Sequence, residues 1–123
     1  MAKHNELGKW GEDVATEYLI AKGYAIAERN WRCGNLEIDI IAYHNSRIVF
    51  VEVKTRHDPE SRPEEAVDRR RMSRMVRAAD AYIQAKNIPH PVQYDVIAIS
   101  GTPTDYKLIH FDDAFFPRMR THR

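Results

Sequence analysis

The sequence has little of several features that would assign a protein to a specialised class. Among its 123 residues Cys33 is the only cysteine, and no paired-histidine motif accompanies it, which excludes an internal disulfide and a cysteine-based zinc site. No apolar run approaches the roughly 20 residues needed to span a bilayer, and no signal-peptide pattern stands at the beginning. We therefore expect a soluble, cytoplasmic protein that does not bind membranes.

The sequence also lacks a strong charge of one sign. Lysine and arginine number 19 against 18 acidic residues, so the net charge is +1. This excludes a polycation that coats nucleic acid through its overall charge, and any basic surface must be local. The length suits one domain with a real core, so we expect residues 1–123 to form a single domain that ends in a disordered basic tail at about 118–123.

Apolar spacing and turn residues predict two helices and five strands. The three-and-four spacing of apolar residues indicates an amphipathic helix over residues 5–22, and a second helix is predicted over residues 64–87. Strands are predicted at residues 24–31, 37–43, 48–55, 92–99 and 106–111, and a short final helix is expected to begin at residues 112–116.

Residues 35–55 hold two apolar runs that charged residues interrupt. Asp39 lies within the first run, and Glu52 and Lys54 alternate with valines in the second. Burying an unpaired charge costs several kcal/mol. These side chains should therefore pair with one another or bind a metal ion.

A short polar segment at residues 44–47 predicts a hairpin between the two runs. If Tyr43 faces Ile48, antiparallel pairing brings the four charges to one face of the sheet, with Asp39 opposite Glu52 and Glu37 opposite Lys54.

Two carboxylates directly across a strand pair repel one another, and a divalent cation would remove the conflict. Mg²⁺ accepts one or two carboxylates, keeps several waters and ligates substrate phosphates, as Mn²⁺ would. Lys54 could then contact the scissile phosphate or stabilise developing negative charge. The alternative is structural: Glu37 and Lys54 form an ordinary cross-strand ion pair, and a one-residue change in the loop turns Asp39 to the other face.

Glu12 is the one acidic side chain of the first helix that points toward the margin of its apolar stripe. Gly8 and Gly11 beside it are poor helix formers, which is tolerable where another chain segment or a ligand must approach closely. The alternative is that Glu12 only solvates the helix margin.

The first half of the second helix carries a local concentration of arginines that the near-zero net charge conceals. Arginine makes forked contacts with phosphate oxygens, so this helix is a candidate for holding nucleic acid, although a charge run of this kind is also typical of a solvated face. The arginines are Arg69, Arg70, Arg71, Arg74 and Arg77.

Asp95 lies in the fourth predicted strand. We expect its side chain at the margin of that strand, and the alternative is that it pairs with an arginine.

The order of Glu12, Asp39 and the triplet Glu52-Val53-Lys54 resembles the PD-(D/E)XK signature of the restriction-endonuclease-like nucleases. Several spaced motifs together resemble the UPF0102 (YraN-like) family of small bacterial proteins. These motifs are Gly8-Lys9-Trp10-Gly11-Glu12, Arg29-Asn30-Trp31-Arg32, Glu37-Ile38-Asp39-Ile40-Ile41-Ala42, Val49-Phe50-Val51-Glu52-Val53-Lys54-Thr55-Arg56 and Asp95-Val96.

The resemblance implies an α/β, restriction-endonuclease-like fold, with a central mixed β-sheet of about five strands flanked by helices, and a relationship to archaeal-type Holliday-junction resolvases. It further implies that Asp39 and Glu52 are metal ligands, that Lys54 is the catalytic lysine, and that Glu12 is an additional ligand or water-positioning acid. Arg56 follows the triplet and joins the helix arginines as a candidate for nucleic-acid binding.

The sequence therefore predicts a Mg²⁺- or Mn²⁺-dependent nuclease that hydrolyses phosphodiester bonds, in DNA with branched, flapped or single-stranded features. Cutting two strands needs two sites, which would suit a homodimer. Two alternatives stay open: a nucleic-acid-binding or assembly module that keeps the fold without turnover, and a purely structural partner protein.

Overall fold

The structure, a computed structural model, describes residues 2–58 and 60–114, and the predicted tail and the phenylalanines of the predicted final helix lie outside them. The elements in chain order are α1 (Ala2–Ala21), β1 (Ala25–Cys33), β2 (Leu36–His44), β3 (Arg47–Arg56), the 3₁₀ helix η1 (Pro63–Ala66), α2 (Arg69–Lys86), β4 (Val92–Thr102) and β5 (Asp105–Phe111). All five predicted strands and both long helices are present.

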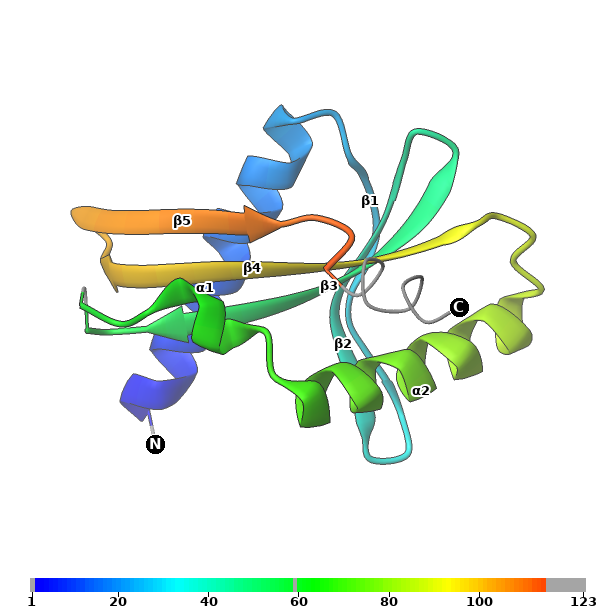
Figure 1. The fold of residues 1–123 in the computed structure, drawn as a ribbon, viewed down its shortest axis with the longest axis horizontal. Helices are drawn as coiled ribbons and strands as arrows, with labels where there is room; N and C mark the ends of the chain where they lie inside the picture. The colour runs from blue at the N-terminus through cyan, green and yellow to red at the C-terminus, as the bar shows by residue number, and fades with distance from the viewer. Residues whose placement is uncertain (1, 59, 115–123) are drawn as a thin grey trace, which may run out of the picture.

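The five strands form one mixed sheet in the order β1-β2-β3-β4-β5. Neighbouring strands are antiparallel except β3 and β4, which are parallel and joined through η1 and α2. Parallel neighbours need such a crossover connection, so α2 is the covering helix of a β-α-β unit. The β1–β2 hairpin crosses the direction of β3, β4 and β5 steeply (Figure 1).

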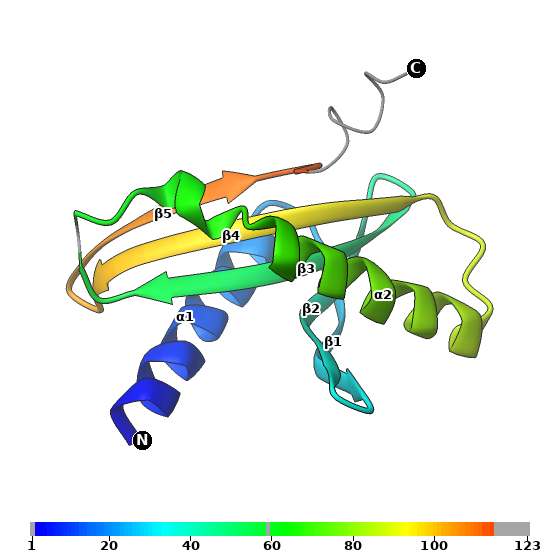
Figure 2. The same ribbon diagram turned by 60° about the horizontal axis from the view of Figure 1, so that its bottom comes forward.

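The two helices cover opposite faces of the sheet (Figure 2). On one face α2 packs through Met72, Met75 and Tyr82 against a cluster that includes Phe50. On the other face α1 packs through Ala15 and Leu19. This α/β arrangement agrees with the restriction-endonuclease-like fold that the sequence resemblance implied.

The predicted hairpin register is confirmed near the turn, where Tyr43 faces Ile48 and the pairing continues to Ile40 opposite Val51. Beyond that pair, β2 continues along β1 while β3 continues along β4 as far as Arg56. The two strands therefore diverge at the next positions, which Asp39 and Glu52 occupy. Strand pairing does not extend to Glu37 and Lys54.

The predicted helix over residues 64–87 is wrong in its first part. The chain forms the short helix η1, breaks at Val67 and Asp68, and begins α2 at Arg69. Asp68 has an extended backbone, and its carboxylate accepts a hydrogen bond from the backbone N–H of Arg70 at 2.9 Å. This is the geometry of a helix N-cap, so Asp68 marks the start of α2 and does not lie inside a longer helix. Asn87, in the left-handed conformation, ends the helix as predicted.

None of the helices in the described part of the chain is both long and apolar enough to cross a membrane.

After β5, residues 112–114 form a turn, and the Ala114 N–H donates to the Tyr94 carbonyl at 2.7 Å. This contact ties the segment after β5 back to β4.

Candidate metal and nucleic-acid site

Asp39 and Glu52 lie where β2 and β3 separate, and α2 covers the same place. A cavity of about 330 Å³ opens there, and it is lined by Asn35, Leu36, Glu37, Asp39, Glu52, Val53, Arg71, Arg74 and Met75. Its walls come from the β1–β2 hairpin, β3 and the first turns of α2. The two acids that the sequence singled out therefore share one cavity with two of the helix arginines.

The Asp39 carboxylate bridges the two diverging strands. Its Oδ2 accepts a hydrogen bond from the backbone N–H of Val53 at 2.8 Å, so a side chain replaces the strand partner where pairing has stopped. This contact fixes the carboxylate beside Glu52. Burial and the neighbouring negative charge of Glu52 raise the pKa of Asp39 from 3.8 to about 8, while the Val53 N–H acts in the opposite direction.

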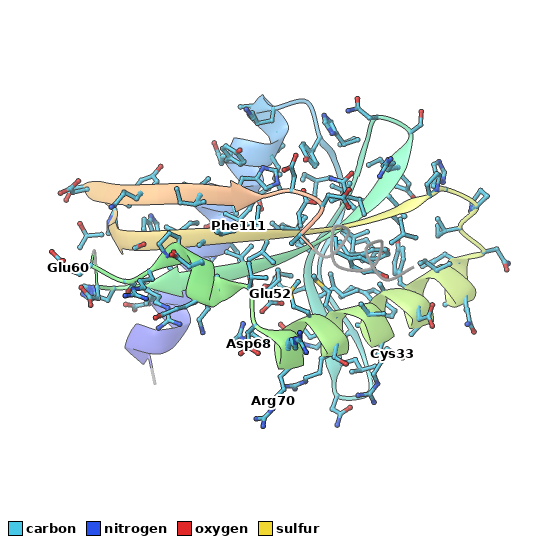
Figure 3. All side chains as sticks on the ribbon, in the orientation of Figure 1. Cys33, Glu52, Glu60, Asp68, Arg70 and Phe111 are labelled. Atoms are coloured by element: carbon cyan, nitrogen blue, oxygen red, sulfur yellow. The ribbon has the colours of Figure 1, made fainter. Side chains whose placement is uncertain are left out.

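Glu52 projects from β3 toward the first turn of α2, near Asp68 (Figure 3). Its Oε2 forms an ion pair with Nη1 of Arg71. Burial raises the pKa of Glu52, and the positive charges of Arg71 and Lys54 oppose that shift. Three carboxylates therefore line the cavity, and two of them already have a cationic partner: Glu52 pairs with Arg71, and Glu37 lies 3.6 Å from Arg32.

Lys54 is two residues after Glu52 on β3, so both side chains lie on the α2 face of the sheet. Burial lowers the pKa of the Lys54 ammonium, and the positive charges of Arg71 and Arg56 add to the effect. Lys54 does not line the cavity itself. It stands near the carboxylate pair as one of four cations that the fold brings to this region, together with Arg56, Arg71 and Arg74.

Glu12 comes from α1, on the opposite side of the sheet. Its Oε1 lies 3.6 Å from Nη2 of Arg29 in β1, which donates its hydrogen bond to the neighbouring Asp13 at 2.9 Å, and Glu12 does not line the cavity. Its negative charge still contributes to raising the pKa of Asp39, after Glu52. Glu12 is thus near the pair but directed to Arg29 in this structure.

The helix packing at Glu12 explains the glycine next to it. A Cβ atom at Gly11 would lie 2.1 Å from the Thr55 hydroxyl oxygen, whereas a Cβ at Gly8 would meet nothing within 4 Å. The expected close approach is therefore confirmed at Gly11, where the approaching segment is β3, and is absent at Gly8.

The two carboxylates fit a hard divalent cation. Mg²⁺ and Mn²⁺ take oxygen ligands, and Mg²⁺ sites commonly use one or two carboxylates plus water and substrate phosphate. Within the described residues no group of three or more His, Cys, Asp or Glu side chains is arranged to hold a metal ion. Asp39 and Glu52 are therefore candidate ligands only as a pair, and Glu12 does not line the cavity with them.

The helix arginines divide into two groups. Arg71 and Arg74 line the cavity, whereas Arg69, Arg70 and Arg77 are exposed and do not. In Figure 3 Arg70 points away from the sheet. The cross-strand ion pair of Glu37 with Lys54, which the sequence left open as the structural alternative, is not formed: Oε1 of Glu37 lies 3.6 Å from Nη2 of Arg32 at the hairpin end.

The expectation for Asp95 is wrong. Its side chain is completely buried, and Oδ2 accepts from the Tyr24 hydroxyl at 3.2 Å and contacts His110 Nε2 at 2.7 Å. Oδ1 accepts from Gln93 Nε2 and from the Asp113 N–H. The sequence signal for this network is an aspartate in an apolar strand, because all its partners except Gln93 come from other elements of the chain.

Comparison with known proteins agrees with the motif resemblance. The family described as "Uncharacterised protein family UPF0102" matches residues 11–99. A UPF0102 protein of Bacteroides thetaiotaomicron is 48% identical over 95% of this chain and 98% of its own length. Relatives from Phocaeicola vulgatus, at 42% over the same shares, and Parabacteroides distasonis, at 40% over 98% of this chain and all of its own length, carry the same name. This chain therefore belongs to the UPF0102 family.

Proposed function

We propose that the protein is a Mg²⁺- or Mn²⁺-dependent nuclease that hydrolyses phosphodiester bonds, with branched, flapped or single-stranded DNA as substrate. The observation that carries the proposal is the pair of partly buried carboxylates, Asp39 and Glu52, where β2 and β3 separate beneath an arginine-bearing helix. Burial, and after it the negative charge of Glu52, raise the pKa of Asp39, so two ionised carboxylates are unfavourable here without a cation. A divalent cation would relieve that repulsion.

In this proposal Asp39 and Glu52 hold the cation, and Lys54 supports them. When bound, the ion would lower the pKa of a ligand water and neutralise charge on the phosphate. The Lys54 ammonium would stabilise the negative charge that develops on the phosphoryl oxygens. Burial and the positive charges of Arg71 and Arg56 lower the pKa of Lys54.

Arg71 and Arg74, which line the cavity, would hold the scissile phosphate, and the exposed Arg69, Arg70 and Arg77 would contact neighbouring phosphates. Arg56, at the end of β3, would extend this basic surface. Such contacts position a nucleic-acid strand without reading its sequence. Glu12 would orient water or join the ligands after leaving Arg29.

The test is hydrolysis of labelled DNA and RNA substrates, with duplex, flapped, branched and single-stranded forms, in Mn²⁺ and in EDTA. Asp39→Ala and Lys54→Ala should each reduce the rate by about 100-fold or more. Lys107→Ala, an exposed lysine of β5, is the matched control and should cut at the wild-type rate. The proposal fails if the wild type cuts no substrate, or if both site variants cut as fast as it does.

One observation favours a second candidate, a nucleic-acid-binding module without turnover. Glu52 already has Arg71 as a partner, and among the described residues no group of three or more His, Cys, Asp or Glu side chains is arranged to hold a metal ion. Such a module would bind DNA equally well in EDTA and in Mn²⁺. Calorimetry would then detect no Mn²⁺ site that depends on Asp39.

A further inference from the structure

We propose that Arg71 exchanges partners at this site: it pairs with Glu52 while no divalent cation is bound, and it transfers to a nucleic-acid phosphate when the cation takes Glu52. The inference rests on the proposed function, since it assumes that Asp39 and Glu52 hold the ion. It makes Arg71 a positioning residue that links metal binding to nucleic-acid binding.

The first step is the present contact. Arg71 is in the first turn of α2, and its Nη1 pairs with Glu52 Oε2. The Glu52 side chain is 17% exposed, whereas the Arg71 side chain is 38% exposed. The carboxylate is therefore fixed in the site, and the guanidinium, at the end of a long flexible stem, is the partner that can leave toward solvent.

The second step is competition for Glu52. A divalent cation between Asp39 and Glu52 needs oxygen atoms of both, and one Glu52 oxygen is in contact with Arg71. Like charges repel most where burial lowers the effective dielectric. The region already contains the positive charge of Lys54, two residues after Glu52 on the same face of β3. A cation should therefore displace Arg71 from Glu52.

The third step is the destination. Arg71 and Arg74 are one helical turn apart and line the same cavity as the carboxylates. A phosphate that ligates the cation would lie within this cavity, where the guanidinium fork of Arg71 suits its oxygens. Cation binding would thus free Arg71 to bind a phosphate, and by linkage phosphate binding would strengthen cation binding.

The exposed arginines of α2 make this inference specific. Arg77 belongs to the same helix and is exposed, but it does not line the cavity. It should contribute to nucleic-acid binding through its charge alone, with no influence on the cation. Arg77→Gln is therefore a matched control for Arg71→Gln when metal affinity is measured.

The experiment is calorimetric titration of the full chain with Mn²⁺ alone. We expect Arg71→Gln to bind Mn²⁺ about tenfold more tightly than wild type, because a charged hydrogen-bond partner no longer competes. Arg77→Gln should stay within about twofold of wild type. If Arg71→Gln does not fold, Arg71→Lys, which cannot form the fork, should still gain about twofold to threefold.

A second experiment measures the binding of labelled single-stranded DNA with and without Ca²⁺. Ca²⁺ takes the place of Mn²⁺ so that DNA binding is measured without DNA cleavage. Ca²⁺ should strengthen DNA binding by the wild type more than by Arg71→Gln. Unchanged Mn²⁺ affinity in Arg71→Gln would reduce Arg71 to a simple phosphate contact and overturn the inference. Weaker Mn²⁺ binding would make the ion pair a support of the site and overturn it too.

These outcomes separate the inference from the proposed function. If wild type and Arg71→Gln both fail to bind Mn²⁺, the metal site itself is wrong and the inference falls with it. If wild type binds Mn²⁺ through Asp39 but Arg71→Gln binds with equal affinity, only the partner exchange is wrong.

Discussion

Asp39 occupies a place where a carboxylate is costly without a cation. Its pKa of about 8, raised by burial and by Glu52, means that the folded, metal-free protein holds a proton that the unfolded chain releases near pH 3.8. Stability contributed by that proton is complete below pH 3.8 and is lost as pH rises through about 8. Asp39 should therefore make the metal-free protein lose stability as the pH rises across the neutral range.

Asp39→Asn should remove this loss. In EDTA at pH 8–9 the variant should be more stable than wild type by about 2 kcal/mol, and the difference should shrink toward pH 4. Urea unfolding at several pH values measures it, with Asp80→Asn, an exposed position on α2, as the control. Parallel stability curves for wild type and Asp39→Asn would contradict the assigned environment of Asp39.

Asp95 illustrates the opposite case, a buried carboxylate whose hydrogen bonds are complete. Asp95→Ala leaves Tyr24, Gln93 and His110 without their acceptor, so it should lower the free energy of unfolding by about 3 kcal/mol. Asp105→Ala in the exposed β4–β5 turn should change it by less than about 0.5 kcal/mol. Loss of Mn²⁺ binding by a stable Asp95→Ala variant would instead place Asp95 in the metal site.

At the scale of elements, the contact between α1 and β3 brings Glu12 toward the carboxylate pair. Gly11 allows Thr55 to pack against the helix backbone, and Gly8, one turn earlier, has open space around it. The two glycines offer a matched test of that contact within one helix.

Gly8→Ala should stabilise the protein by up to about 1 kcal/mol through helix propensity alone. Gly11→Ala should destabilise it by about 1–3 kcal/mol, because the new methyl group collides with Thr55. Thermal unfolding measures both, and adding Thr55→Ala should recover most of the Gly11→Ala loss. If Gly11→Ala were as stabilising as Gly8→Ala, the close packing of α1 on β3 would be wrong.

Elements that local sequence determines were predicted well. The hairpin register followed from a short polar turn and from alternation, both of which act within a few residues, and Tyr43 does face Ile48. The divergence of β2 and β3 after Ile40 and Val51 was not predictable, because it depends on their outer neighbours, β1 and β4. The break before α2 was missed because Val67 fits the apolar stripe of a continuous helix, although Asp68 is a readable cap.

At the scale of the whole molecule, a net charge of +1 hides a concentration of charges of both signs at one cavity. Acidic Asp39 and Glu52 lie in a cavity that α2 lines with Arg71 and Arg74. Sequence patterns predicted both sets but not their contact, since Glu52 and Arg71 are 19 residues apart and meet only through the β3-to-β4 crossover. For the same reason the ion pairs of Arg29 with Asp13 and Glu12 could not be read from the sequence.

The central claim is that Asp39 and Glu52 share a divalent cation, and a crystal structure grown with Mn²⁺ tests it most directly. The anomalous signal of Mn²⁺ should show one ion with a carboxylate oxygen of each residue at about 2.1 Å, a typical oxygen distance for ions of the Mg²⁺ type, and Arg71 should have left Glu52. Crystals in which Arg71 still pairs with Glu52, with Mn²⁺ bound only elsewhere or not at all, would contradict the claim.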